Sequence, residues 1–416
     1  MSGLLRRWAL DPTLVALVAL LSLLGLAMIY SAGQTRFPDP VVVEAWRRQA
    51  VWLALGLVAF TVVSRITVRW LEWVAVPAYV IALVLLAATL VVGTGAGTAA
   101  GTKSWIVLGP LRFQPAEPAK LATILVLARY LALRGGAPSS LRDLLVPGTL
   151  VAAPLALVML QPDLGTAQAF MGILFATLFW AGTPLPLLLL LASPLPALIL
   201  AYDNTVWGVY VVLVIIALYL WRYRLYFYES VAVVLANFAA GTIARPLWDS
   251  LATYQQNRLL VFLDPQVDPR GAGYHLIQSM VAVGNGGLSG KGFLAGTQKR
   301  FDFLPEQHTD FIFSVVGEEL GFIGVAFALF AFGLLLARLV RLAEDTSDPF
   351  AGLVLLGIFG AWTVHIFVNI GMTVGLVPVT GIPLPFVSYG GSFLLMSWVA
   401  TAVAVRVAHE DERAVA

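Results

Sequence analysis

Ionisable side chains are concentrated in one stretch of an otherwise apolar chain. Charged residues make up only 12% of the 416 residues, and the mean hydropathy is +0.88. Residues 248–310 nevertheless contain many acidic, basic and histidine side chains, among them Arg258, Asp264, Asp268, Arg270, His275, Lys291, Lys299, Arg300, Asp302, Glu306, His308 and Asp310. Because binding and catalytic residues lie disproportionately on loops, we expect the chemistry of this protein in that stretch.

Two Asp-Pro pairs are the first motif in this stretch. Asp264 and Asp268 each precede a proline, and glycines follow at positions 271 and 273. Asp-Pro favours turns, and glycine lets a ligand or a backbone segment approach closely. A carboxylate on such a turn can reach into a cavity, where burial raises its pKa and suits it as a general base. The alternative is that each aspartate only caps its local turn.

A glycine-rich run, GNGGLSGKG at residues 284–292, is the second motif. Glycines bring backbone N–H groups close to an anion, and Lys291 adds a positive charge, so the run resembles a phosphate-cradling loop. It lacks the spacing of a Walker A motif. A flexible loop is the alternative.

Carboxylates near the expected helix ends form a third group. Asp310 or Thr309 could cap the next helix, which carries Glu318 and Glu319 about two turns further on. Carboxylates at that depth in a membrane protein usually face a cavity or a cationic partner. Asp163, between two expected spans, has the same two readings of helix cap and site residue.

Glu117 and Lys120 have the i,i+3 spacing of an ion pair on one helix face, which can be structural or functional. The last motif surrounds Ser388 and contains Asn369, Pro378, Gly381, Pro383, Pro385, Tyr389, Gly390 and Gly391.

The rest of the chain predicts an all-α polytopic membrane protein. Hydrophobic residues make up 60% of it, above the ~45–50% of soluble domains, and runs long enough to cross a bilayer recur. We expect twelve spans, at 14–31, 49–64, 71–93, 118–133, 143–160, 166–182, 184–201, 207–222, 227–246, 311–338, 350–372 and 387–407. Four prolines between 184 and 196 indicate that the seventh is broken or re-entrant. The apolar segment after Arg6 and Arg7 is too long for most signal peptides and is taken as the first span.

Paired arginines predict the orientation of these spans. They recur at alternate turns: Arg6 and Arg7, Arg65 and Arg69, Arg134 and Arg142, Arg222 and Arg224, Arg338 and Arg341, Arg406 and Arg413. By the positive-inside rule, both termini are then cytoplasmic and the 248–310 loop is extracytoplasmic. Residues 94–117 and 373–386 are irregular outer segments, which membranes tolerate where they line a cavity. We expect all three segments to form the walls of one cavity.

Composition excludes some chemistry. The chain has no cysteine, so it has no disulfide, thiol nucleophile or cysteine metal site, and its four histidines are too scattered for an obvious zinc cluster. Asp264, Asp268 and Glu306 could hold Mg²⁺ with waters, but no ligand spacing demands a divalent cation. We expect a membrane lipid environment and no nucleic-acid partner.

Taken together, the motifs resemble those of the SEDS family of bacterial wall synthesis. The matching stretches are SWIVLGPLRFQPAEPAK, QPDLGTA, NRLLVFLDPQVDPRGAGYHLIQS, GNGGLSGKG, FLPEQHTDFIFSVVGEELG and GIPLPFVSYGG. They cover most of the chain, and they are more similar to the elongation branch, RodA, than to the division branch, FtsW. The resemblance implies a single integral membrane domain over 1–416, in the bacterial cytoplasmic membrane with its site on the outer face.

The resemblance also implies an activity and a partner. It implies a peptidoglycan glycosyltransferase that polymerises lipid II into glycan strands and pairs with a class B penicillin-binding transpeptidase. The family's catalytic aspartate matches Asp268, its buried Glu and Lys pair matches Glu117 and Lys120, and its QPDLG aspartate matches Asp163. Two features depart from the family: residues 184–225 look like a helical pair added to the usual ten spans, and Phe393 stands where a small residue is usual.

The expected reaction joins a sugar hydroxyl to a lipid-pyrophosphate-linked sugar, so it needs a base and cations. We expect Asp268 to be the base. The candidate substrate-binding residues are Lys120, Glu117, Asp163, Arg258, Lys291, Lys299, Arg300, His308 and Ser388. Two other functions remain open, a lipid II flippase and a non-catalytic scaffold that activates a penicillin-binding protein. A flippase would need polar residues through the full membrane thickness, whereas the polar residues here cluster towards one face.

Overall fold

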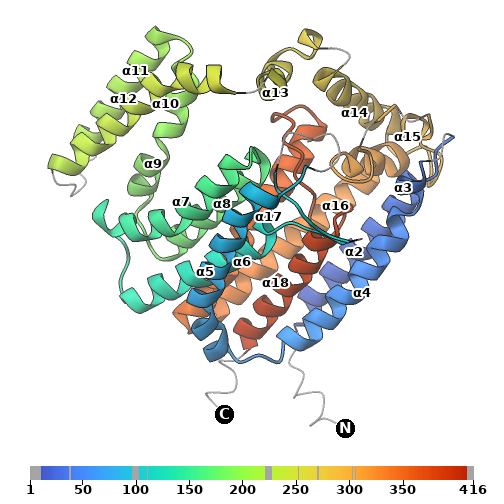
Figure 1. Ribbon diagram of the computed structural model, residues 1–416, viewed down its shortest axis with the longest axis horizontal. Coiled ribbons are helices and arrows are strands. Elements are labelled where there is room, and N and C mark those ends of the chain that lie inside the picture. The colour runs from blue at the N-terminus through green and yellow to red at the C-terminus, as the bar shows by residue number, and fades with distance from the viewer. Residues whose placement is uncertain are drawn as a thin grey trace.

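The computed structural model describes residues 11–36, 39–95, 103–109, 111–220, 227–251, 253–268, 271–301, 303–304 and 306–409. Helices dominate this part of the chain (Figure 1). The first half contains α2 (Pro12–Ala32), α3 (Pro40–Val43), α4 (Ala45–Val63), α5 (Val68–Val92), α6 (Ala116–Arg134), α7 (Leu145–Leu160) and α8 (Leu164–Trp180). A hairpin of β1 (Ile106–Leu108) and β2 (Leu111–Phe113) and a short η1 (Arg142–Leu144) complete it.

The second half carries the polar loop between two sets of long helices. It contains α9 (Leu185–Ala192), α10 (Pro194–Leu200), α11 (Asn204–Leu220), α12 (Phe227–Ser250), α13 (Thr253–Leu263), η2 (Pro265–Val267), α14 (Ala272–Gly286), α15 (Thr297–Arg300), α16 (Ile312–Asp345), α17 (Pro349–Thr373) and α18 (Gly391–His409). The expected 248–310 loop is therefore not extended chain, because it folds into α13, η2, α14 and α15.

Each of the twelve expected spans coincides with a helix or a helix pair. The seventh is broken between α9 and α10, where Ser193 precedes Pro194, as the prolines predicted. In the described part of the chain, seven helices are long and apolar enough to cross a membrane by themselves, and three apolar helices are shorter. The chain is thus an all-α polytopic membrane protein. The expected cytoplasmic arginines Arg6, Arg7, Arg222, Arg224 and Arg413 lie outside the described residues.

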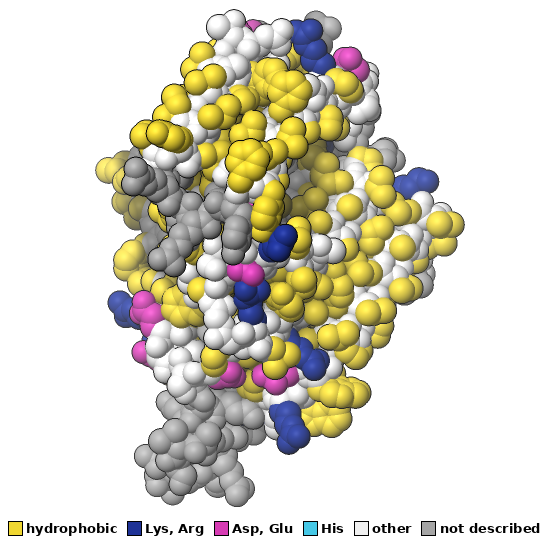
Figure 2. Space-filling view, turned by 90° about the vertical axis from the view of Figure 1, so that its left-hand side faces the viewer, with side chains coloured by type: hydrophobic (Ala, Val, Ile, Leu, Met, Phe, Trp, Pro, Cys, Tyr) yellow, Lys and Arg dark blue, Asp and Glu magenta, His cyan; other side chains and the backbone are white. Residues whose placement is uncertain are grey.

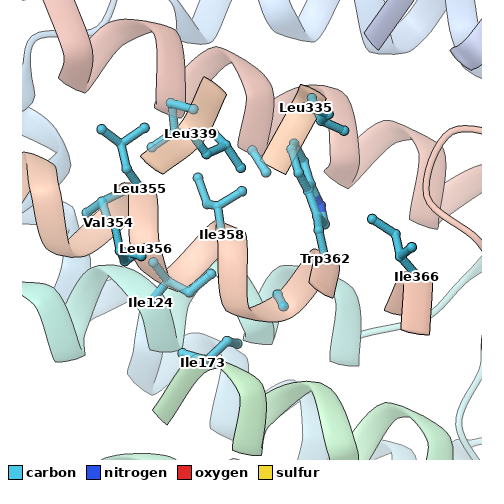
Figure 3. Packing of buried hydrophobic residues seen from close by; sticks show 14 of the residues in the cluster. Ile124, Ile173, Leu335, Leu339, Val354, Leu355, Leu356, Ile358, Trp362 and Ile366 are labelled. Carbon is cyan, nitrogen blue, oxygen red and sulfur yellow. The ribbon is translucent and has the colours of Figure 1, made fainter. Parts of the chain in front are cut away.

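Helix α17 lies at the centre of the bundle. About 78% of its most apolar window is buried, against 17% for α12. Leu355, Ile358 and Trp362 of α17 pack with side chains of α6, α8 and α16 (Figure 3). A Cβ on Gly172 of α8 would meet the carbonyl of Gly360 of α17, so glycine is what allows these helices to cross closely. This close packing fixes the ends of the helices that carry the site.

Helices α10, α11 and α12 form a lobe beside the bundle (Figure 1). A small apolar cluster joins the lobe to α9 and consists of Leu190 of α9, Val214 of α11 and Val233 of α12. Asn237 of α12 donates to the Ser193 hydroxyl at 2.8 Å, and Tyr210 donates to the Ser193 carbonyl at 2.7 Å. Helices α10, α11 and α12 are therefore held together by a buried polar contact at the α9–α10 break, and the insertion of 184–225 stays a prediction.

The outer surface of the helices is apolar, as lipid contact requires. On the face seen in Figure 2, hydrophobic side chains cover most of the area, and charged side chains occur in small groups. The side chains of Val84, Val209 and Ile323 are each more than half exposed. In water such a surface would be unfavourable, so the bilayer is its expected solvent.

The polar segments meet at one end of the bundle, which we call the loop end. Helix α16 begins there, and its later part lies at the opposite end, where Arg338 forms an ion pair with Asp11 at the start of α2. Helix α18 begins at the loop end with Gly391 and runs away from it to His409. The described chain thus starts and ends on the side opposite the polar loop.

Candidate active site

Asp268 lies in a tight turn between η2 and α14. The backbone N–H of Gly271 donates to its carboxylate at 2.9 Å, and the N–H of Gly273 donates to its carbonyl at 2.9 Å. A Cβ at Gly271 would collide with the Asp268 carboxylate, and a Cβ at Gly273 would collide with the carbonyls of Pro265 and Asp268. The glycines of the motif are thus required by this turn, which presents a partly exposed carboxylate near the N-terminus of α14.

Arg258, His275 and Glu306 share an electrostatic environment with Asp268. The pKa of His275 is lowered by burial and by the charge of Arg258, against the opposing effects of Glu306 and Asp268. The His275 ring stacks on Phe311 with 6.0 Å between centroids. The imidazole therefore favours its neutral form beside the carboxylate, and Arg258 is the nearby permanent cation.

Asp310 is a second carboxylate in this region. Burial and the neighbouring charge of Glu306 raise its pKa to about 7, although Arg258 opposes the shift. A Cβ built on Gly381, whose backbone has a φ of +75°, would lie 3.1 Å from the Asp310 carboxylate. Neither Asp310 nor Thr309 caps α16, because Phe311 is at the N-cap and makes no side-chain capping bond. The capping interpretation was wrong, and Asp310 instead faces the segment around Gly381.

The turn at 306–310 is fixed to the segment 382–390. Ser388 donates its hydroxyl to the Thr309 carbonyl at 2.7 Å and accepts the N–H of Leu384 at 2.8 Å. Asn369 donates to the carbonyls of Asp310 and Ile382 at 3.0 and 2.7 Å. Ser388 is buried, so the structure gives it a role in holding two segments together, and its contact with substrate stays a prediction.

His308 is buried in the same wall. Its ring lies against Tyr389 at a centroid distance of 5.4 Å, and its carbonyl accepts the N–H of Tyr389 at 2.9 Å. Burial lowers its pKa, and Glu306 opposes that effect. The neutral ring is therefore placed as a wall of the site, and its predicted contact with substrate is untested.

Asp163 joins the site from α8. Its carboxylate accepts the N–H of Thr166 at 3.0 Å, which caps the helix, and also the side-chain amide of Gln114 at 3.1 Å. A Cβ at Gly165, in the first turn of α8, would meet the Thr380 carbonyl, so the start of α8 lies against the segment that Asp310 contacts. The three expected walls are thus brought together through Gln114, Asp310 and Thr380.

Glu117 and Lys120 form the predicted ion pair, with 2.9 Å between the ammonium and the carboxylate. Both side chains are buried. The structure adds a partner that sequence reasoning missed: His365 Nε2 lies 2.9 Å from Lys120 Nζ. A histidine within an expected membrane span, four residues before Asn369, was the available signal.

These three residues line a cavity of about 40 Å³ between α6, α17 and α18. One water needs roughly 10–15 Å³, so the volume suits a few waters and no sugar or lipid chain. Beyond these three residues the lining is mostly apolar, with Leu121, Ile124 and Ala400. Its other polar side chain is Ser397, whose hydroxyl donates to the Phe393 carbonyl within α18 at 2.8 Å.

Lys299 is placed differently from the prediction. Its side chain is 0% exposed, and its ammonium lies 2.5 Å from the equally buried carboxylate of Glu319. The ammonium also donates to the Ser31 carbonyl of α2 at 2.7 Å, and the Ser31 hydroxyl donates to Glu319 at 2.7 Å. This burial assigns Lys299 a structural role in place of the expected contact with a pyrophosphate.

Glu318 caps α15 from the side. Its carboxylate accepts the N–H groups of Thr297 and Gln298 at 2.7 and 2.9 Å, and Lys291 lies 3.8 Å away. The expectation that Glu318 and Glu319 face cationic partners is confirmed.

The glycine-rich loop braces a broken helix. Helix α16 is interrupted at Gly321, whose φ is +64°. Lys291 and Gly292 donate their N–H groups to the carbonyls of Glu318 and Glu319, each at 3.0 Å. Conversely, the N–H groups of residues 322 and 323 donate to the carbonyls of residues 287 and 288 at 2.9 and 3.1 Å.

These loop amides are therefore bound to the orphan groups of the break. The phosphate-cradle interpretation is not supported for the amides of 291 and 292. Lys291 and Arg300 remain on the exposed surface, as their predicted role requires.

Metal ligands are not assembled here. Within the described residues, no three histidine, aspartate or glutamate side chains are arranged to hold a metal ion. Asp264, which was a candidate oxygen donor, accepts the N–H of Gln266 at 2.9 Å and caps η2.

The fold and site define a class: a multi-span helical membrane protein with a carboxylate turn over one end of its bundle. A family profile described as cell cycle protein (FtsW, RodA, SpoVE) matches residues 12–413. The chain therefore belongs to the FtsW/RodA/SpoVE family, which is the SEDS family.

Named relatives and solved structures agree with this assignment. The chain is 36% identical over 389 residues to the peptidoglycan glycosyltransferase MrdB of Escherichia coli, covering 93% of this chain and 90% of that protein. It is 34% identical over 427 residues to the peptidoglycan glycosyltransferase RodA of Treponema pallidum, covering 95% and 97%.

Two solved structures are similar in fold. The chain matches one in a peptidoglycan synthase complex, described as coordinating polymerization and crosslinking, with a TM-score of 0.72, 34% identity and coverage of 97% and 99%. It matches the rod shape determining protein RodA of Thermus thermophilus with a TM-score of 0.64, 30% identity and the same coverage.

Proposed function

We propose that this protein is a peptidoglycan glycosyltransferase that polymerises lipid II, with Asp268 as its general base. The observation that carries the proposal is the turn that presents the Asp268 carboxylate at the loop end, beside Arg258 and Glu306. The names of the relatives in Escherichia coli and Treponema pallidum support the same reaction class.

The proposed step moves one proton and exchanges one bond. The 4-hydroxyl oxygen of the acceptor sugar attacks C1 of the donor sugar, and its proton passes to the Asp268 carboxylate. The bond between C1 and the pyrophosphate oxygen breaks with inversion, and the lipid pyrophosphate leaves as an anion. One carboxylate on the attacking side is enough, because pyrophosphate leaves without the protonation that an alcohol needs.

Cations stabilise the charge that develops on the leaving group. Arg258 is the first candidate because its charge acts on both His275 and Asp310, which flank the site. Lys120 is also buried and paired with Glu117, but unlike Lys299 it lines a small cavity, so it could act on the leaving group only through water. Lys291 and Arg300 lie at the surface. Lys299 drops out of this set because its ammonium is buried against Glu319.

We infer that the protein works in the bacterial cytoplasmic membrane with the loop end on the extracytoplasmic face. Twelve crossings with both termini cytoplasmic are consistent with the shared position of the start of α2 and the end of α18. A class B penicillin-binding transpeptidase is the proposed partner, since the similar structure belongs to a complex that coordinates polymerization with crosslinking. The proposed role is in cell elongation.

The test is a polymerisation assay with purified protein and labelled lipid II. Asp268→Asn keeps the shape of the turn and removes the base, so we expect polymer formation to fall by about 10²-fold or more. Asp264→Asn is the matched control, because Asp264 is a nearby exposed carboxylate that caps η2, and it should retain activity. Polymerisation by Asp268→Asn at the wild-type rate would refute the assignment, and a parallel reaction with a chelator tests metal dependence.

A flippase is less well supported. The buried charges Glu117 and Lys120 lie in the first turns of α6, and Glu318 and Glu319 lie in the second turn of α16. Beyond them the lining of the cavity is mostly apolar, and its Ser397 hydroxyl is bonded within α18, so no continuous polar path is seen among the described residues. A lipid headgroup crossing the bilayer would need such a path.

A further inference from the structure

His365 of α17 bridges two parts of the site that are distant in sequence. Its Nε2 lies 2.9 Å from Lys120 Nζ, and its Nδ1 lies 3.0 Å from the Pro383 carbonyl oxygen. An ammonium can only donate and a carbonyl can only accept. These partners therefore assign the ring proton to Nδ1, and Nε2 accepts a hydrogen bond from Lys120.

The position of the Lys120 ammonium depends on this bond. Glu117 holds the ammonium on one side at 2.9 Å, and His365 holds it on another. The Phe393 ring lies 5.2 Å from the ammonium and stacks on His365 with 4.8 Å between centroids. Phe393, which departs from the family pattern, thus packs against both Lys120 and His365. Without His365, Glu117 would be the one remaining hydrogen-bonding partner of the ammonium among those described.

Pro383 connects His365 to the catalytic side of the site. It lies in the segment 382–388, which Asn369 and Ser388 bind to the turn at 306–310. That turn carries Glu306, whose charge acts on His275 as that of Asp268 does, and Asp310, whose pKa responds to Glu306. A continuous set of contacts therefore runs from the turn through Pro383 and His365 to Lys120.

We propose that His365 is a positioning residue that holds the Lys120 ammonium at a place set by the segment 382–388, and so sets the affinity for the anionic part of the substrate. The inference rests on the proposed contact of Lys120 with substrate. The competing explanation is that His365 only fills space between α17 and α18. The two explanations differ in what a glutamine at this position would do, because glutamine offers both an acceptor to Lys120 and a donor to Pro383.

The kinetic test compares His365→Leu with His365→Gln in the lipid II assay. Loss of a hydrogen bond to a charged group predicts a fall in kcat/KM on the order of 10- to 100-fold for His365→Leu. The fall should reside mainly in KM, since the contact is present before the reaction. His365→Gln should recover most of it. A kcat/KM for His365→Leu within twofold of wild type, or equal losses in both variants, would overturn the proposal.

A double-mutant cycle tests whether His365 acts through Lys120. If it does, the kcat/KM of the double variant Lys120→Met with His365→Leu should equal the kcat/KM of Lys120→Met alone. Independent, multiplying losses would overturn the proposal. Ile366→Ala is the matched control, because Ile366 is the next residue on α17 and is also buried. Any fold-loss in kcat/KM that Ile366→Ala causes should multiply with the fold-loss caused by Lys120→Met.

A spectroscopic test does not depend on activity. The chain has four histidines, so ¹⁵N-histidine labelling gives few signals, and His365→Gln assigns the one of interest. We expect a neutral ring protonated at Nδ1 whose Nε2 signal shifts in Lys120→Met. A ring protonated at Nε2, or a signal unchanged by Lys120→Met, would overturn the coupling.

The contact of Lys120 with substrate and its coupling to His365 can be refuted separately. Full polymerisation by Lys120→Met would refute the contact of Lys120 with substrate, and with it the kinetic role of His365. The ring-nitrogen signals would still decide whether His365 is coupled to Lys120.

Discussion

The Asp268 carboxylate and the backbone of Gly271 are in direct contact: the Gly271 N–H donates to Oδ1 at 2.9 Å, and no Cβ fits between them. The hydrogen bond aims the carboxylate, and the missing side chain leaves it room. The catalytic proposal therefore depends on a glycine as much as on an acid.

Gly271→Ala should displace the Asp268 carboxylate while leaving it chemically intact. A misplacement of about 1 Å can reduce a rate on the order of 100-fold, so we expect polymerisation to fall by 10- to 100-fold. Gly284→Ala on α14 is the control, because a Cβ there meets nothing within 4 Å. The control should retain activity, and equal activity of both variants would contradict the role of the contact.

Lys299→Met should destabilise the fold by leaving the Glu319 carboxylate buried without its cation. Breaking a buried ion pair costs about 3–5 kcal/mol, measurable as a lower midpoint of thermal unfolding in detergent. The double variant Lys299→Met with Glu319→Leu should recover most of that loss. Lys291→Met is the control: its ammonium is 3.8 Å from Glu318 and its side chain is 31% exposed, so we expect a change within about 1 kcal/mol. Similar losses in the two single variants would contradict the structural assignment of Lys299.

Gly321→Ala tests the brace between the glycine-rich loop and α16. The φ of +64° is unfavourable for alanine, and the added Cβ would meet the backbone of Gly290 and Leu288. We expect a loss of more than about 1 kcal/mol in unfolding free energy. Gly333→Ala, later on the same helix, meets nothing within 4 Å and should be neutral or stabilising. A stable Gly321→Ala would show that the interruption of the helix is not required.

Asp310 gives the stability a defined pH dependence. Its folded pKa is raised to about 7, against about 3.9 in an unfolded chain, so between these values only the folded state holds the proton. Stability from this group is therefore present at low pH and is lost as the pH rises from about 4 to 7. Asp310→Asn removes this pH-dependent loss of stability. The unfolding midpoint of the variant minus that of wild type should therefore increase as the pH is raised from 5 to 8. Glu344→Gln, on the exposed far end of α16, should show no such trend. A constant difference between Asp310→Asn and wild type across that range would refute the shift.

The helices were predictable because membrane spans are apolar on all faces. The proline after Ser193 also predicted the break between α9 and α10. The Asp268 turn was predictable as a turn, since Asp-Pro and the two glycines restrict the backbone. These features depend on residues that are neighbours in the chain, so one sequence is enough to predict them.

The misassigned residues depend on contacts between distant segments. Lys299 pairs with Ser31, 268 positions away, and nothing near Lys299 in the sequence indicates burial. The free N–H groups of a glycine-rich loop can bind the oxygens of an anion or the unpaired carbonyls of an interrupted helix. The glycines at 286–292 therefore do not distinguish the two cases in the sequence. The role of His365 depends on its hydrogen bond with Lys120, which lies 245 positions earlier in the chain.

The interruption of α16 at Gly321 has a mechanical consequence. Four backbone hydrogen bonds join the loop at 287–292 to the two ends of the interruption. The loop cannot move away from α16 without leaving these amides and carbonyls unpaired. A displacement of this loop would therefore be transmitted directly to α16.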